Sequence, residues 1–281
     1  MLTTTNHSRD SAGLTYIYPV ISRRSKGLSI GVNLNPNNAC NWHCVYCQVP
    51  GLTRGSAPAC DLGLLETELR DFLGDVIHGD FFRRFDIAAE HQTIRDIAIS
   101  GNGEPTSSAE FDRVVGLIGA TAGDYDLLGK IKLVLITNGS LVRRESVQKG
   151  LAHWSELGGE VWFKLDSATE AGIQRVNGVH HALESVRCNL ESVAHLCPTW
   201  LQTCLFAVDG QPPSWDECKA YLGLLVAFQN QNIPLSGVLL YGLARPSMQT
   251  EAPRLAALPT EWMEAFAGEI RKTGMDARLS I

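Results

Sequence analysis

The chain has 281 residues, of which 44% are hydrophobic and 19% are charged. This length and composition exclude an intrinsically disordered chain and allow a sizeable core to form without disulfides. The 24 basic and 30 acidic side chains give a formal net charge of −6, which argues against a general nucleic-acid coat.

Short apolar runs alternate with amphipathic segments along most of the chain. Strands are predicted over residues 29–35, 95–100, 131–136, 160–165, 200–206 and 237–241. Helices are predicted over residues 62–77, 108–120, 142–157, 168–176, 183–195, 214–230 and 260–273, with a last strand at 276–281. Several strands are nearly continuous apolar runs, which is typical of parallel strands covered on both faces.

This alternation predicts a single α/β domain, either a partial parallel (β/α)6 TIM-like barrel or an open doubly wound sheet. In both architectures, chemistry gathers at the carboxyl ends of the strands. Polar and glycine-rich segments follow most of the predicted strands, so we expect them to build one site. The expected organisation is an N-terminal extension over residues 1–28, a core over 29–250, and a C-terminal helix and strand over 251–281 that pack on the core.

No targeting or membrane segment is expected. The residues from Met1 to Ser11 are polar, and no uninterrupted apolar run is long enough to span a bilayer. A cytoplasmic location is therefore expected, with no membrane partner. In that compartment the eight cysteines are expected to be thiols or metal ligands rather than disulfides.

Three cysteines are crowded together in a C-x3-C-x2-C pattern formed by Cys40, Cys44 and Cys47. Structural zinc sites take four ligands, usually from two separated pairs, and no second pair follows here. A [4Fe-4S] cluster held by three cysteines leaves one iron open to bind a small molecule. A zinc site with His43 as the fourth ligand and a set of inert thiols are the alternatives.

Further motifs follow the second and third predicted strands. Ser100–Thr106 reads SGNGEPT, and Ile136–Gly139 reads ITNG. Together with the cysteine pattern and the aromatic Tyr46, these segments resemble the radical SAM superfamily. Tyr18–Arg24 and Gly31–Pro36 resemble its wyosine-synthase-like branch. The resemblance extends over most of the chain and favours the partial barrel.

The resemblance implies a radical SAM enzyme. Cys40, Cys44 and Cys47 would hold a [4Fe-4S] cluster, and its open iron would bind the amino and carboxylate groups of S-adenosyl-L-methionine. One electron from the cluster would then cleave that cofactor to a 5′-deoxyadenosyl radical, which abstracts hydrogen from a substrate. A flavodoxin or ferredoxin-type protein is the electron donor that the resemblance implies.

The resemblance also implies a set of residues that bind S-adenosyl-L-methionine, although it assigns no catalytic residue. Gly103 and Glu104, with Gly101 beside them, are expected near the methionyl amino group, because glycine lets a ligand approach the backbone closely. Tyr46 is expected near adenine, and the strand-end residues near the ribose and the carboxylate are Asn138, Lys164 and Asp166. The plainer interpretations are an ordinary turn, a core aromatic and satisfied strand-end polar groups.

The substrate is left open by the sequence. The wyosine-synthase resemblance points to a tRNA base, and a small metabolite or a peptide is an equal alternative. A hypothesis from another class is a non-catalytic module that binds zinc at the cysteine loop.

Overall fold

The computed structural model describes residues 12–22 and 26–280. Arg23 and Arg24 of the Tyr18–Arg24 motif, and the last residue of the predicted final strand, lie outside these residues. The chain divides into two compact units. Among the described residues, the first unit comprises 12–22, 26–41, 55–136 and 144–160, and the second comprises 42–54, 137–143 and 161–280.

The first unit is built on four strands that lie in the order β1, β2, β5 and β6. Their bounds are β1 (Ile17–Ser22), β2 (Gly27–Val32), β5 (Ile94–Ile99) and β6 (Lys132–Thr137). β1 pairs antiparallel with β2, whereas β2, β5 and β6 run parallel. The residues of β2 are largely buried, because helices cover the sheet.

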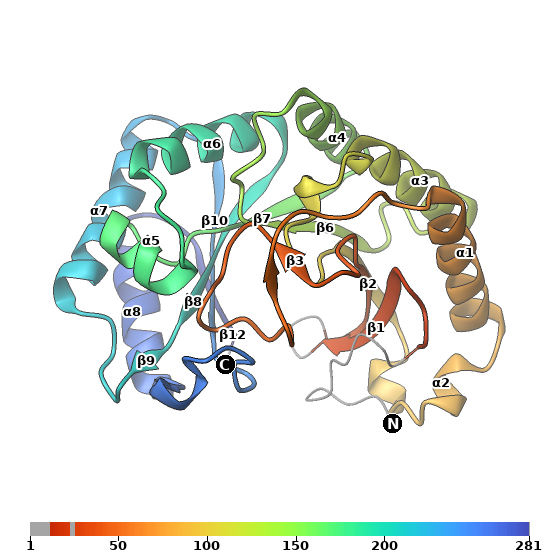
Figure 1. Ribbon diagram of the computed structural model, residues 1–281, viewed down its shortest axis with the longest axis horizontal. Helices are drawn as coiled ribbons and strands as arrows, with labels where there is room; N and C mark the ends of the chain where they lie inside the picture. The colour runs from red at the N-terminus through yellow and green to blue at the C-terminus, as the bar shows by residue number, and fades with distance from the viewer. Residues whose placement is uncertain (1–11, 23–25, 281) are drawn as a thin grey trace. The chain divides into compact units, whose positions relative to one another are not determined.

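Four helices belong to the first unit: α1 (Leu62–His78), α2 (Phe81–Arg84), α3 (Phe111–Asp124) and α4 (Glu145–Glu156). Figure 1 shows α1, α3 and α4 side by side along one face of these strands. α1 begins at Asp61, whose carboxylate accepts a hydrogen bond from the Leu64 amide at 3.0 Å. Leu65, Leu69 and Leu73 recur at helical spacing and are fully buried, so they fix the inner face of α1.

The second unit has four parallel strands in the order β7, β8, β10 and β12. Their bounds are β7 (Glu160–Lys164), β8 (Thr199–Leu205), β10 (Leu235–Gly242) and β12 (Ala277–Ser280). The helices of this unit are α5 (Glu170–Asn177), α6 (Leu183–Leu196), α7 (Trp215–Asn230) and α8 (Thr260–Lys272). Every residue of β8 is buried, as expected for a strand inside a covered parallel sheet.

Short elements complete both units. In the first unit these are β3 (Ala39–Cys40) and two 3-10 turns at Ala89–His91 and Pro105–Ser107. In the second they are β4 (Thr53–Arg54), a 3-10 turn at Ala252–Arg254, and an antiparallel pair formed by β9 (Ala207–Val208) and β11 (Leu255–Ala256). Among the described residues, no helix is both long enough and apolar enough to cross a bilayer.

The predicted α/β class with mainly parallel strands is confirmed, with local differences at β1 and at the starts of α3 and α4. β1 was not predicted, because Pro19 interrupts its apolar run; the strand lies at the end of the strand order, where a missing amide is tolerated. The helix expected from residue 108 begins at Phe111, because Pro105–Ser107 first form a 3-10 turn capped by Glu104. The helix expected from residue 142 likewise begins at Glu145.

Candidate functional site

In the first unit, the segment after β5 requires its two predicted glycines. Gly101 has a φ of +154°, and a Cβ there would lie 2.2 Å from Oδ1 of Asn33. A Cβ on Gly103 would lie 2.0 Å from the carbonyl oxygen of Ala39, the residue before Cys40. The two glycines therefore let the chain pass close to Asn33 and to the backbone beside Cys40, while the approach of a ligand to this segment stays a prediction.

Glu104 is buried and caps the turn that follows it. Its Oε1 accepts hydrogen bonds from the amide of Thr106 at 3.0 Å and from its hydroxyl at 2.5 Å. The ordinary-turn interpretation therefore describes part of what Glu104 does. A contact with the methionyl amino group stays a prediction.

A group of asparagines fixes the backbone that leads to Cys40, and the sequence analysis did not find it. Oδ1 of Asn33 accepts from the amides of Asn35 and Asn102, at 3.1 and 3.0 Å. Nδ2 of Asn35 donates to the Ala39 carbonyl at 2.9 Å, and Nδ2 of Asn102 donates to Asn38 at 2.6 Å. The Asn102 that separates Gly101 from Gly103 thus has a structural function of its own.

In the second unit, the loop over residues 42–54 is bound to the C-terminal end of α5. The amide of His43 donates to the carbonyl of Asn177 at 3.0 Å, and the amide of Val45 donates to the carbonyl of Val176 at 2.9 Å. These bonds satisfy carbonyls that a helix end otherwise leaves without partners. Gly178 follows with a φ of +65°, and a Cβ there would lie 2.6 Å from the His43 carbonyl oxygen.

The same loop is held from a second direction by residues 247–249. The hydroxyl of Ser247 lies 2.7 Å from the Val45 carbonyl oxygen and 3.2 Å from that of Cys47. Nε2 of Gln249 donates to the carbonyls of Cys47 and Val49, at 3.2 and 3.0 Å. Residues 42–54, which we call the cysteine loop, are therefore a fixed structure rather than a free segment of chain.

Asp166, directly after β7, is the centre of a hydrogen-bond network beside this loop. Its Oδ2 accepts from the Tyr46 hydroxyl at 2.5 Å and from Nδ2 of Asn177 at 2.7 Å. Its Oδ1 accepts from the amide of Cys204 at 2.9 Å. The structure thus has Asp166 orienting protein groups, and its expected contact with ribose stays a prediction.

Tyr46 is buried against Phe206, with ring centroids 5.6 Å apart. Burial, together with the negative charge of Asp166, raises the pKa of the Tyr46 phenol well above its usual value. The phenol therefore stays protonated and acts as the donor to Asp166. This is the core-aromatic interpretation, and stacking near adenine stays a prediction.

Lys164, at the end of β7, lies between two tyrosines. Its Nζ donates to the Tyr241 hydroxyl at 2.9 Å and lies 5.0 and 5.4 Å from the ring centroids of Tyr46 and Tyr241. Burial favours a lower pKa for Lys164, but the Tyr241 oxygen and the Asp166 carboxylate outweigh it and raise this pKa above its usual value. Lys164 therefore presents a permanent ammonium group, which suits an anionic ligand.

Asn138 follows β6 and belongs to the second unit. Its Oδ1 accepts from the amide and the hydroxyl of Ser140, at 3.0 and 2.7 Å. Gly139 has a φ of +70°, and a Cβ there would lie 2.0 Å from the Phe163 ring. Thus Tyr46, Lys164 and Asp166 are gathered around one network, while the bonds described for Asn138 lie within its own turn.

The three cysteines of the motif are all partly buried. Nδ2 of Asn177 lies 3.3 Å from Sγ of Cys44, and burial with the nearby Asp166 raises the pKa of this thiol to about 12. Cys40 belongs to the first unit, and Cys44 and Cys47 belong to the second. Within residues 12–22 and 26–280, no group of three or more His, Cys, Asp or Glu side chains is gathered as a metal site, so cluster ligation stays a prediction.

The donor set nevertheless fits an iron–sulfur cluster. Cysteine thiolates are the soft ligands that such clusters take, and the N–H group of Asn177 that faces Sγ of Cys44 is a typical surrounding of a ligating cysteine.

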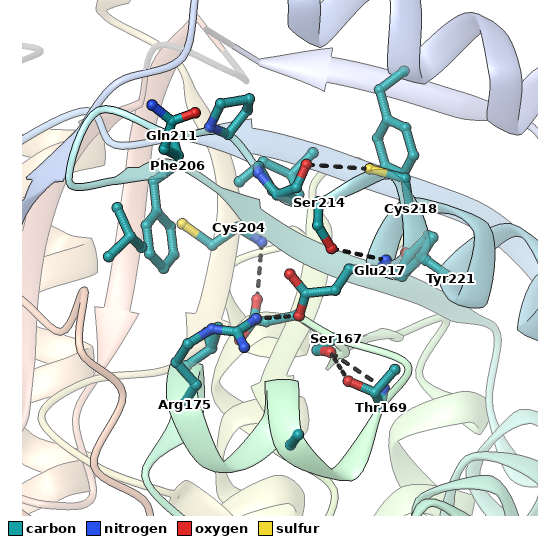
Figure 2. A pocket seen from close by; sticks show the side chains of 18 residues that line it. Ser167, Thr169, Arg175, Cys204, Phe206, Gln211, Ser214, Glu217, Cys218 and Tyr221 are labelled. Atoms are coloured by element: carbon teal, nitrogen blue, oxygen red, sulfur yellow. Dashed lines mark hydrogen bonds and ion pairs between the residues drawn. The ribbon is translucent and has the colours of Figure 1, made fainter.

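A cavity of about 410 Å³ lies in the second unit on the side of Asp166 and Cys204 (Figure 2). Its lining is mainly apolar, with Phe206 and Tyr221 among the aromatic residues. Figure 2 also shows the ion pair between Arg175 of α5 and Glu217 of α7 at its edge. Cavities of this size hold small molecules or single side groups of larger ones.

Solved structures with a similar fold include three proteins of low sequence identity. A radical SAM methyltransferase from Sphaerobacter thermophilus aligns with a TM-score of 0.60 at 13% identity, over 93% of this chain and 68% of its own. TYW1 with a lysine–pyruvate adduct bound aligns with a TM-score of 0.57 at 15% identity, over 88% and 74%. The C140S mutant of spore photoproduct lyase aligns with a TM-score of 0.54 at 12% identity, over 86% of this chain and 74% of its own.

The chain therefore shares the fold of these proteins, which confirms the predicted partial parallel α/β barrel. Among curated proteins, it is similar to the UPF0026 protein MJ1312 of Methanocaldococcus jannaschii, with 30% identity over 168 residues. That match covers 59% of this chain and 44% of the relative, so it spans less than half of the relative's length. No family among those scanned matches the chain.

Proposed function

We propose that the protein is a radical SAM enzyme that binds a [4Fe-4S] cluster and S-adenosyl-L-methionine. The observation that carries the proposal is the cysteine loop, which is fixed beside Lys164 and Asp166 at the carboxyl ends of parallel strands. In α/β folds of this kind, ligands bind at that edge of the sheet. The fold shared with a radical SAM methyltransferase supports the same conclusion.

Cys40, Cys44 and Cys47 hold the cluster in this proposal. When bound, the cluster supplies one electron that cleaves S-adenosyl-L-methionine to a 5′-deoxyadenosyl radical, and this radical takes hydrogen from the substrate. The protein contributes the fixed geometry of the ligands, the orientation of the cofactor and the exclusion of water. The fixed geometry comes from the hydrogen bonds that α5 and residues 247–249 make with the cysteine loop.

The remaining predicted residues bind S-adenosyl-L-methionine in this proposal. The Lys164 ammonium pairs with the methionyl carboxylate, because it stays protonated and a charge-assisted hydrogen bond is roughly twice as strong as a neutral one. The backbone at Gly101 and Gly103, with Glu104, receives the methionyl amino group. Asn138 and Asp166 bind ribose hydroxyls, and the Tyr46 ring bounds the adenine pocket.

The test is an anoxic purification followed by reconstitution with iron and sulfide. We expect about four iron and four sulfide per chain, a reduced-cluster EPR signal that changes when S-adenosyl-L-methionine is added, and 5′-deoxyadenosine formation with dithionite. A zinc-loaded, iron-free protein that leaves the cofactor intact would instead establish the alternative, a non-catalytic zinc module.

A flavodoxin or ferredoxin-type protein is the proposed physiological electron donor. Reduced flavodoxin should replace dithionite in the formation of 5′-deoxyadenosine, and the rate should fall with salt if charged surfaces guide the encounter. A rate that matches the reaction without any reductant would remove this part of the proposal.

The substrate proposal is a tRNA base, with a small metabolite or a peptide as the alternatives. The cavity beside Asp166 has the size of one base or a small molecule, and TYW1 shares the fold. A tRNA substrate would bind with an affinity that falls steeply with salt, because phosphate contacts release counterions. Undetectable or salt-independent binding of tRNA would leave the small-molecule and peptide classes.

A further inference from the structure

Asn177 joins the Asp166 network to a sulfur atom of the cysteine loop. It is the last residue of α5, and its side chain is buried. Its Nδ2 lies 2.7 Å from Oδ2 of Asp166 and 3.3 Å from Sγ of Cys44. Both contacts lie within the second unit.

The chemistry of these groups fixes the direction of both hydrogen bonds. A carboxylate only accepts, so the group of Asn177 that faces Asp166 must be the amide nitrogen and not the amide oxygen. That nitrogen carries two hydrogens, and the second is available to Cys44. A flipped amide would place its oxygen against the carboxylate, so Asp166 locks Asn177 as a donor to sulfur.

The main chain of Asn177 restricts the same contact. Its carbonyl accepts from the amide of His43 at 3.0 Å, and the carbonyl of Val176 accepts from the amide of Val45 at 2.9 Å. These two bonds flank Cys44 in the sequence. The distance between the Asn177 amide and the Cys44 sulfur is therefore set by the backbone as well as by Asp166.

We propose that Asn177, oriented by Asp166, is a positioning residue that donates a hydrogen bond to the Cys44 thiolate and raises the reduction potential of the cluster. The inference rests on the proposed function. A reduced cluster places more negative charge on its sulfur ligands than an oxidised one, so a donor to sulfur stabilises the reduced form. Groups around the ligands of a metal site tune it in this way.

The test is an EPR-monitored redox titration of the reconstituted holoprotein. N177L keeps the size of the side chain but removes both N–H groups. We expect the ratio of reduced to oxidised cluster at a fixed potential to fall about tenfold, which for a one-electron couple is about 59 mV. If N177L does not retain iron, N177S carries the same measurement, because its hydroxyl is too short to bridge Asp166 and the sulfur.

Gln174 supplies the matched control. It lies on α5, is exposed, and contacts His180 through its side-chain amide at 3.3 Å. Q174L therefore removes an amide from the same helix without touching the cysteine loop, and its potential should equal that of the wild type. A potential that is unchanged or higher in N177L would overturn the inference.

Failure of the inference is distinguishable from failure of the proposed function. A wild-type protein that assembles its cluster and cleaves S-adenosyl-L-methionine, with a potential that N177L does not lower, contradicts only the role of Asn177. A wild-type protein that binds no iron contradicts both.

Discussion

The hydroxyl of Tyr46 and Oδ2 of Asp166 lie 2.5 Å apart across 120 residues of sequence. This bond connects the cysteine loop to the end of β7. Y46F removes it while keeping the ring that packs on Phe206. Because the acceptor is a carboxylate, we expect the free energy of unfolding of the apoprotein to fall by about 1.5–3 kcal/mol, measured by urea denaturation.

Tyr125 provides the comparison for this change. Its hydroxyl donates to the neutral carbonyl of Arg70 at 2.8 Å. Y125F should therefore lower the free energy of unfolding by only about 0.5–1.5 kcal/mol. Equal losses for the two variants would mean that the charge of Asp166 does not strengthen the Tyr46 bond.

A glycine in the turn after β5 and a glycine inside α8 should respond in opposite ways to replacement by alanine. In G103A, the new Cβ would lie 2.0 Å from the Ala39 carbonyl oxygen, so the backbone next to Cys40 must shift and the protein should lose more than about 2 kcal/mol of stability. G268A, inside α8, meets nothing within 4 Å and should gain about 0.5–1 kcal/mol. Thermal unfolding of both apoproteins measures these changes in stability. A G103A protein as stable as the wild type would refute the close approach of Gly103 to Ala39.

Removing one cysteine of the motif should abolish iron binding. C44A leaves the loop with two thiols, and we expect the brown chromophore and the formation of 5′-deoxyadenosine to disappear together. C60S is the control, because Cys60 is also free and partly buried but lies outside the motif. Iron analysis and absorbance decide the outcome, and retention of both in C44A would contradict its assignment as a ligand.

Lys164 should contribute to the affinity for S-adenosyl-L-methionine. K164M removes the ammonium group, and we expect the Kd of the cluster-loaded protein to rise by about tenfold or more, as the loss of a charge-assisted hydrogen bond implies. K149M removes an exposed lysine that pairs with Glu145 and should leave the Kd unchanged. Titration calorimetry compares the Kd values of the two variants. An unchanged Kd in K164M would show that Lys164 does not contribute to cofactor binding.

Cys60 gives a prediction for pH. Burial and the nearby carboxylates raise the pKa of its thiol to about 11, against an ordinary value near 9. The folded state therefore favours the neutral thiol, and the stability that this thiol contributes is present below pH 9 and lost as the pH rises towards 11. At pH 8, alkylation of Cys60 should be about a hundredfold slower in the folded than in the unfolded protein. Mass spectrometry follows the alkylation of Cys60. Equal alkylation rates in the folded and the unfolded protein would contradict the raised pKa of this thiol.

The regular elements of this fold could be predicted from the sequence because each has a repeated pattern. Apolar runs mark β5, β6 and β8, and helical spacing marks α1. The residues that position the cysteine loop carry no such pattern. Ser247 and Asn177 are single polar residues, and only the fold shows that they reach the loop.

The candidate site was predicted in part. Tyr46, Lys164 and Asp166 were found because polar residues after apolar strands gather at one edge of a parallel sheet. The hydrogen bond between Tyr46 and Asp166 was not predicted, because no pattern in the sequence indicates that two residues 120 positions apart are in contact. Asn177 with Gly178 carried only the signal of a helix C-terminus, which does not indicate a contact with sulfur.

The bonds from Ser247 and Gln249 to residues 45–49 bridge about 200 positions of chain. On the ribosome, the later partners emerge about 10–40 s after the thiols, at elongation rates of about 5–20 residues per second. The cysteine loop therefore receives its final shape only after residue 249 has been made, and loading with iron and sulfide must follow that moment. A nascent chain stalled before Ser247 should take up no cluster, whereas one stalled well beyond Gln249 should.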